Sequence, residues 1–109
     1  MENTFARKIL GRDVTATLID TGDGISVTLY GGDRGHIGAI SIKTPGEEAV
    51  TRELPGHREG IVAEKWAERL SEHFGCTVVV SCGIHYDGIT KEGILEVLQG
   101  SDELLEGIL

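Results

Sequence analysis

Apolar and polar residues alternate regularly in the first third of the chain. Residues 14–19 and 25–30 carry an apolar side chain at every second position, with serine or threonine between most of them. Because successive side chains of a strand point to opposite faces of a sheet, this alternation predicts two strands with one covered and one more polar face. Residues 20–24, Asp-Thr-Gly-Asp-Gly, are typical of a β-hairpin loop. We therefore predict that the two strands pair antiparallel.

Further strands are predicted on both sides of this hairpin. Residues 5–10 have weak strand character, and residues 50–54 form a strand after the turn at 44–48. Residues 36–42 are small or apolar on both faces, which is typical of a central strand. Residues 77–82, Thr-Val-Val-Val-Ser-Cys, favour a buried strand because three of them are β-branched valines in succession. Together these segments predict an antiparallel meander of about five or six strands.

Two segments have the apolar periodicity of helices. Residues 61–74 place apolar side chains, Trp66 among them, on one stripe and charged side chains on the other. Gly75 is well placed to end this helix in the left-handed conformation. Residues 91–98 predict a second helix, for which Thr90 can serve as the N-cap.

Glycine is expected to limit the second helix. Gly100 should interrupt it, and Ser101 should cap a last turn or two. The predicted fold class is therefore α+β, with an antiparallel sheet and two or three helices packed on one of its faces. The 109 residues suit a single domain, which we place at residues 1–109.

Charge and composition narrow the class of partner. The chain has 10 basic and 18 acidic residues, a net charge of −8, and no basic cluster, so nucleic acid and anionic membrane surfaces are not expected as partners. It has no apolar segment of membrane-spanning length and no apolar signal core at its start. Cys76 and Cys82 are too far apart along one strand to form a disulfide, which fits a reducing compartment. We expect a cytoplasmic protein.

Polar residues gather where the predicted elements begin and end. His36 starts a strand, His57 stands between a strand and a helix, and His85 ends a strand and is followed by Tyr86 and Asp87. In an antiparallel sheet, the start of one strand and the end of its neighbour share an edge. We therefore predict that the three histidines converge, with Asp87 hydrogen-bonded to one imidazole.

These residues suit the binding of an anionic ligand. Histidine and arginine bind anions, glycine-rich turns expose backbone N–H groups, and tyrosine offers a ring for stacking. Glycine inside a strand, as at Gly38, often marks a close approach of another group. The predicted ligand-binding residues are His36, His57, His85, Asp87, Arg34, Arg58, Tyr86, Gly38 and Gly83.

Catalysis and metal binding are weaker interpretations of the same histidines. No nucleophile elbow or oxyanion-hole signature is present, so we predict no catalytic residues. Histidine and aspartate are suitable ligands for zinc or iron, but their spacing matches no metal-binding motif, so we predict no metal site. A small metal-dependent hydrolase or isomerase that uses these histidines remains the alternative.

Three motifs carry a family resemblance. The segments Gly-His-Ile-Gly-Ala at 35–39, Leu-Pro-Gly-His-Arg-Glu at 54–59 and Gly-Ile-His-Tyr-Asp-Gly-Ile-Thr-Lys-Glu at 83–92 resemble, in this order, the LpdD-like proteins. The resemblance covers about residues 14–98. It implies a non-catalytic chaperone that binds or hands over prenylated FMN, or stabilises the apo-form of a UbiD-type aromatic-acid decarboxylase.

Assembly is the last expectation. The fold also looks similar to that of small proteasome-assembly chaperones, so a chaperone whose only ligand is another protein is a further alternative. Sheet edges need cover, and the apolar residues at 104, 105 and 108 were expected to lack a partner within one subunit. We therefore predict a homodimer.

Overall fold

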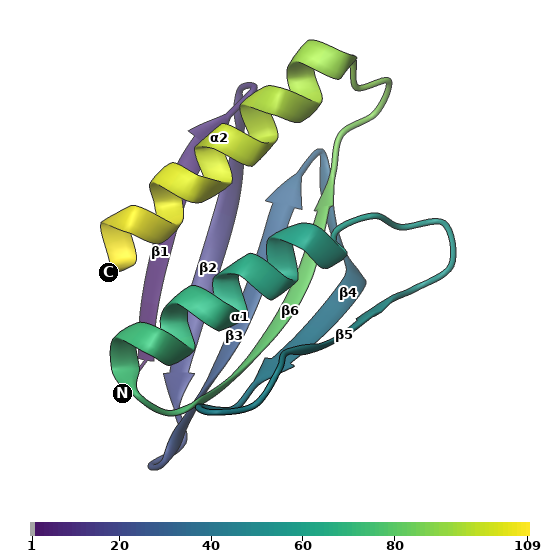
Figure 1. Cartoon of the computed structure of the whole chain (residues 1–109). Helices are drawn as coiled ribbons and strands as arrows, with labels where there is room; N and C mark the ends of the chain where they lie inside the picture. Colours follow the sequence, from purple (N-terminus) through teal and green to yellow (C-terminus); the bar gives the residue numbers. More distant parts are fainter. Residues whose placement is uncertain (1) are drawn as a thin grey trace.

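The computed structural model describes residues 2–109, which fold into one sheet and two helices (Figure 1). Each element lies close to where the apolar pattern predicts it. The strands and helices follow one another in the order β1 (Glu2–Ile9), β2 (Arg12–Asp20), β3 (Gly24–Gly32), β4 (Arg34–Lys43), β5 (Val50–Glu53), α1 (Gly60–Phe74), β6 (Thr77–His85) and α2 (Lys91–Ile108).

The sheet has six strands in the order β1-β2-β3-β6-β4-β5. Its neighbours are antiparallel except β3 and β6, which are parallel. The predicted α+β class is confirmed, but β6 interrupts the meander by lying between β3 and β4. A strand that carries valines on both faces gains most from a position with a neighbour on each side. Alternation within β3 and β4 does not reveal that a later strand separates them.

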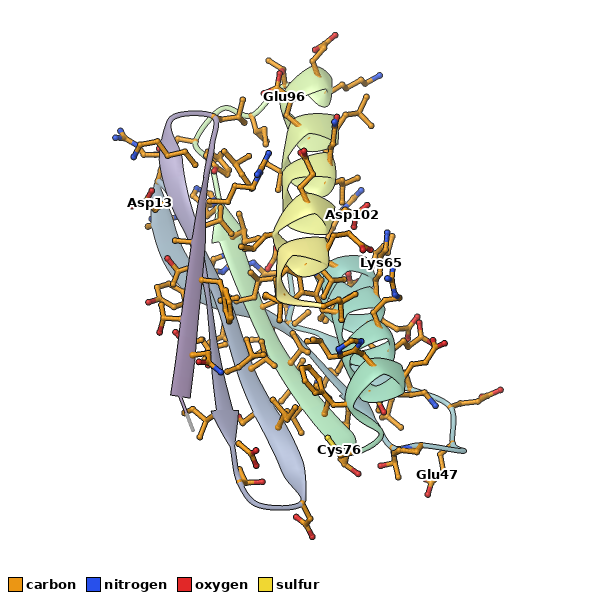
Figure 2. The ribbon with its side chains drawn as sticks, turned by 90° about the vertical axis from the view of Figure 1, so that its left-hand side faces the viewer. Asp13, Glu47, Lys65, Cys76, Glu96 and Asp102 are labelled. Atoms are coloured by element: carbon orange, nitrogen blue, oxygen red, sulfur yellow. The ribbon has the colours of Figure 1, made fainter. Side chains whose placement is uncertain are left out.

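Both helices cover the same face of the sheet (Figures 1 and 2). Helix α1 lies over β4 and β6, and α2 lies over β1. Trp66, predicted to point inward, is fully buried, as are Leu70 on α1 and Leu105 on α2. Lys65 and Asp102 form an ion pair of 2.9 Å between the helices (Figure 2). The core therefore lies between the two helices and one face of the sheet.

The predicted end of α1 and the predicted start of α2 are confirmed. Gly75 ends α1 in the left-handed conformation with φ 68°, and its N–H donates to the carbonyl of Ser71. The side chain of Thr90 accepts a hydrogen bond of 3.0 Å from the N–H of Gly93 at the start of α2.

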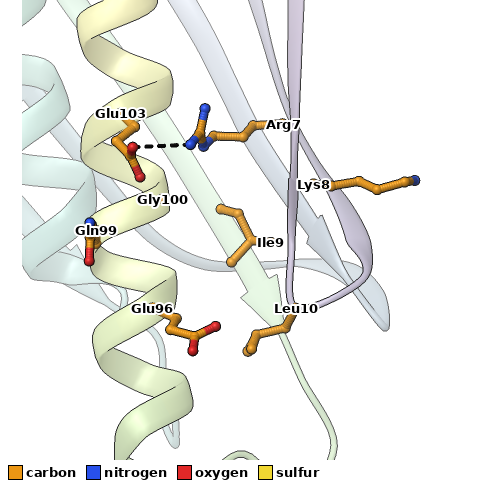
Figure 3. A pocket seen from close by; sticks show the side chains of 8 residues that line it. All are labelled: Arg7, Lys8, Ile9, Leu10, Glu96, Gln99, Gly100 and Glu103. Carbon is orange, nitrogen blue, oxygen red and sulfur yellow. Dashed lines mark ion pairs between the residues drawn. The ribbon is translucent and has the colours of Figure 1, made fainter.

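Gly100 does not interrupt α2, contrary to the sequence-based expectation. The helix continues to Ile108, and Ser101 is buried within it and is not a cap. A Cβ at Gly100 would lie 2.7 Å from the Cδ1 of Ile9, so this glycine lets α2 approach β1 (Figure 3). An ion pair of 3.0 Å between Arg7 and Glu103 lies beside this contact. Gly100 therefore serves helix-to-strand packing.

A cavity of about 340 Å³ lies along this β1–α2 contact (Figure 3). It shares no residue with the site described below. In the part of the chain that the structure describes, neither helix combines the length and the apolar character needed to cross a bilayer.

Candidate functional site

A bulge in β4 places His36 at the site. Gly35 pairs with Ile84 and Ala39 pairs with Cys82, so the residues from 36 to 38 stand opposite the single residue Gly83. A Cβ at Gly83 would lie 1.6 Å from the carbonyl oxygen of His36. The absence of a side chain at Gly83 is therefore what allows the bulge to fold against β6.

A second glycine makes room for a carboxylate. Glu59 immediately precedes α1, and a Cβ at Gly38 would lie 1.4 Å from its Oε2 atom. The backbone carbonyl of Gly38 also accepts a hydrogen bond of 2.8 Å from the N–H of Leu54. The predicted close approach at Gly38 is confirmed, and the approaching group is the Glu59 side chain.

The three histidines predicted to converge lie side by side. The ring centroids of His36 and His57 are 4.5 Å apart, and those of His36 and His85 are 6.0 Å apart with perpendicular rings. The Nε2 atom of His36 lies 3.6 Å from Oε2 of Glu59, and Nδ1 of His57 lies 4.0 Å from Oε1. We call His36, His57, His85 and Glu59 the histidine cluster.

Glu59 was not selected from the sequence. It follows His57 by two residues, which was the one available signal, but nothing in the sequence places it against Gly38. Its side chain is only 17% exposed.

Asp87 fixes the orientation of His85. The Nε2 atom of His85 forms a hydrogen bond of 2.8 Å with Oδ1 of Asp87. The backbone N–H of Asp87 donates to Oδ2 of Asp33, and Nε of Arg12 donates to Oδ1. These hydrogen bonds, that from Asp87 first and that from Arg12 second, hold the pKa of Asp33 below its usual value. Asp33, which the sequence did not single out, therefore anchors the loop that carries Asp87.

Tyr86 is held by its hydroxyl group. The phenol donates a hydrogen bond of 2.5 Å to the carbonyl of Ile9 in β1. Burial raises its pKa, and the nearby carboxylate of Asp33 raises it further. The hydroxyl is thus occupied by a hydrogen bond within the protein. The residue also lines the groove described below.

An apolar groove of about 530 Å³ opens beside the histidine cluster. It lies between the start of α1, the end of β6 and the first half of α2, and Glu59 and His85 belong to both sites. Arg58 and Tyr86 supply further polar groups. The apolar lining consists of Ile61, Val62, Ile84, Ile89, Ile94, Val97 and Leu98.

The groove was not predicted from the sequence, because the apolar stripes of both helices were expected to pack on the sheet. Ile61 is 76% exposed and Ile94 is 46% exposed, although both belong to the apolar stripes of their helices. Periodicity identifies the apolar side of a helix but does not tell which part of that side meets the sheet. At this end of the molecule the helices line an open groove.

The two predicted arginines remain at the surface. Arg34 is exposed and pairs with His85 across β4 and β6, and Arg58 is exposed and lines the groove. Gly38 and Gly83 have no side chain, which leaves room for the carboxylate of Glu59 and the carbonyl of His36. The structure thus brings the predicted residues to one end of the sheet, and their role in ligand binding stays a prediction.

Comparisons with known proteins show the fold and the family of this chain. A chain from a novel chaperone complex for yeast 20S proteasome assembly has a TM-score of 0.59 and 19% identity, with 98% of this chain and 94% of that chain covered. This likeness shows the fold. Protein LpdD of Lactiplantibacillus plantarum is 25% identical over 97% of this chain and 82% of its own length. Residues 8–109 match the profile described as the prenylated flavin chaperone LpdD-like domain. Because this match covers nearly the whole chain, the protein belongs to the LpdD-like chaperone family.

Proposed function

We propose that this protein is a non-catalytic cytoplasmic chaperone that binds prenylated FMN transiently and delivers it to a UbiD-type aromatic-acid decarboxylase. The observation that carries the proposal is the apolar groove beside the histidine cluster, in a chain of this family. Its volume of about 530 Å³ lies within the range of ligand sites, about 300–1,000 Å³.

The groove has the two kinds of surface that a flavin nucleotide needs. A prenylated isoalloxazine is a large planar ring system with a polar pyrimidine edge, and its dimethylbenzene and prenyl-derived parts are apolar. These apolar parts match the aliphatic side chains that α1, β6 and α2 contribute. The phosphate is an anion, and Arg58 and His85 are the groove residues suited to bind it. We expect the ring in the groove and the phosphate toward the histidines.

Transfer also requires release. The net charge of −8 opposes retention of a phosphate once it leaves its local partners. A chaperone that must give up its cargo gains from this balance of local attraction and long-range repulsion.

The chemistry of the nearest thiol supports binding without catalysis. Cys82 follows Ser81 in β6, close in sequence to His85, but burial raises its pKa to about 12. A thiol acts as a nucleophile only as the thiolate, so Cys82 is inert at neutral pH.

Two helix substitutions test the groove. Ile94→Glu places a carboxylate in the groove, whereas Leu95→Glu alters the neighbouring residue, which is 66% exposed and does not line the groove. Titration of prenylated FMN, followed by its absorption spectrum, should give at least a tenfold weaker affinity for Ile94→Glu and a near wild-type affinity for Leu95→Glu.

Delivery is tested with a separately purified apo-decarboxylase. We expect its activation by prenylated FMN to be faster with the wild-type protein than without it, and Ile94→Glu to lose this effect. If Ile94→Glu binds prenylated FMN with the same affinity as the wild type, the groove is not the binding site. Stabilisation of the apo-enzyme without any flavin binding would indicate a chaperone whose only ligand is a protein.

A further inference from the structure

Three side chains from separate segments present metal-ligating atoms to one another. His36 comes from the β4 bulge, His57 from the loop after β5, and Glu59 from the residue before α1. One ligand atom from each lies within 4.8 Å of the others. All three residues are partly buried, so the folded chain holds the atoms together away from bulk solvent.

Two of these atoms have no hydrogen-bond partner among the described residues. The Nε2 atom of His36 and the Oε2 atom of Glu59 are buried and form no hydrogen bond with the described residues. They lie 3.6 Å apart, which is too long for a hydrogen bond. Buried polar atoms are nearly always satisfied, because leaving them unpaired destabilises the fold. A cation placed between them would satisfy both.

The donor set identifies the class of cation. Two imidazole nitrogens and one carboxylate oxygen are ligands typical of zinc and of other first-row transition metals, whereas magnesium and calcium prefer oxygen alone. With bonds of about 2.0–2.1 Å, neighbouring ligand atoms of a tetrahedral ion are about 3.4 Å apart. Nε2 of His36 lies 3.6 Å from Oε2 of Glu59, Nδ1 of His57 lies 4.0 Å from Oε1, and one ligand atom from each residue lies within 4.8 Å of the others. Side-chain shifts of about 1 Å would bring these atoms to the spacing of a tetrahedral ion.

We infer that His36, His57 and Glu59 form a binding site for one divalent transition-metal ion. His85 lies beside the site, hydrogen-bonded to Asp87, and is not one of the three residues whose ligand atoms lie within 4.8 Å of one another. Three protein ligands leave a fourth position for water or another small donor. The sequence analysis considered histidine and aspartate as metal ligands, found no metal-binding motif and did not include Glu59. The set inferred from the structure contains Glu59 in place of the aspartate.

The inference goes beyond the proposed function and gives His36 and His57 a different role. The test measures metal binding to protein that contains no flavin. Its outcome is therefore independent of the flavin titration. The chain is purified without a histidine tag, treated with chelator, and titrated with Zn²⁺ by calorimetry and with Co²⁺ by visible absorption. Mg²⁺ serves as the control ion.

We expect one equivalent of Zn²⁺ to bind, and Co²⁺ to show the intense visible bands of a tetrahedral site. Glu59→Gln, which keeps the shape of the side chain, and His57→Ala, which alters a loop residue, should each weaken the affinity at least tenfold. His73→Ala on the exposed side of α1 should bind as the wild type does.

Two results would overturn the site. One is the absence of saturable binding at one equivalent, which would leave the cluster as an ion pair between histidine and glutamate. The other is binding that survives in both Glu59→Gln and His57→Ala, or that is lost in His73→Ala, since the ion would then use different ligands.

Discussion

Two glycines, Gly83 and Gly38, shape the histidine cluster. Gly83 leaves space for the carbonyl of His36, and Gly38 leaves space for the carboxylate of Glu59. Glycine inside a strand weakens it, so its presence at both positions reflects the approach of other groups. The sequence predicted that something approaches Gly38, but the identity of the group depends on contacts between segments that are distant along the chain.

Gly83→Ala should destabilise the fold by about 1–3 kcal/mol, the cost of overpacking an interior. Its Cβ would lie 1.6 Å from a backbone oxygen, which has no flexible side chain to move aside. Gly107→Ala is the matched control, because nothing lies within 4 Å of its Cβ and alanine favours a helix. Urea unfolding measures both; equal stability of Gly83→Ala and the wild type would show that the bulge relaxes freely.

The buried thiol of Cys82 gives a pH-dependent term in stability. Its pKa is raised to about 12 in the folded chain, so the unfolded chain releases this proton at lower pH. Stability from the protonated thiol is therefore complete below the unfolded pKa and is lost as the pH rises toward the folded value.

Between about pH 8 and about pH 10, the wild type should lose roughly 1.5–2 kcal/mol more unfolding free energy than Cys82→Ala does. Urea unfolding at the two pH values gives the change in unfolding free energy of each protein. Comparing these changes cancels the stability that the substitution itself costs. Identical losses in both proteins would mean that the thiol ionises equally well when folded.

At the level of elements, local signals located the strands and helices, while their neighbours were set by packing. The stripe that includes Trp66 and the end of α1 at Gly75 follow from the residues themselves. The place of β6 between β3 and β4 and the packing of Gly100 on Ile9 do not. Both depend on contacts between elements that are distant along the chain.

Trp66→Ala should destabilise the fold by about 3–5 kcal/mol. The indole is fully buried under α1, and its removal leaves a cavity that the surrounding strands are poorly placed to fill. Its Nε1 atom has no hydrogen-bond partner among the described residues, so Trp66→Phe should cost less than Trp66→Ala. Because this is the sole tryptophan in the sequence, circular dichroism should follow the unfolding. A similar midpoint for Trp66→Ala and the wild type would contradict this packing.

At the level of the whole molecule, the histidine cluster joins segments that are far apart in the chain. The start of one strand and the end of its antiparallel neighbour share an edge, and this rule predicted that the histidines meet. The pairing of β4 with β6, which brings His36 and His85 together, was not predicted. The groove was not predictable, because it depends on how the start of α1 and the first half of α2 lie relative to the end of β6. The same limit applies to the argument for assembly. Leu104 and Leu105 are buried in the core, so the expectation that they lack a partner was wrong.

The homodimer remains a prediction that rests on the edges of the sheet. Strands β1 and β5 are its outer strands, and each has a free edge within one chain. Unpaired N–H and C=O groups on an edge favour pairing with another strand, and a second copy is always available for it. Light scattering at about tens of micromolar should therefore give twice the mass of 11.7 kDa. A monomer mass at that concentration would mean that the short β5 and the charged side chains of β1 protect the edges without a partner.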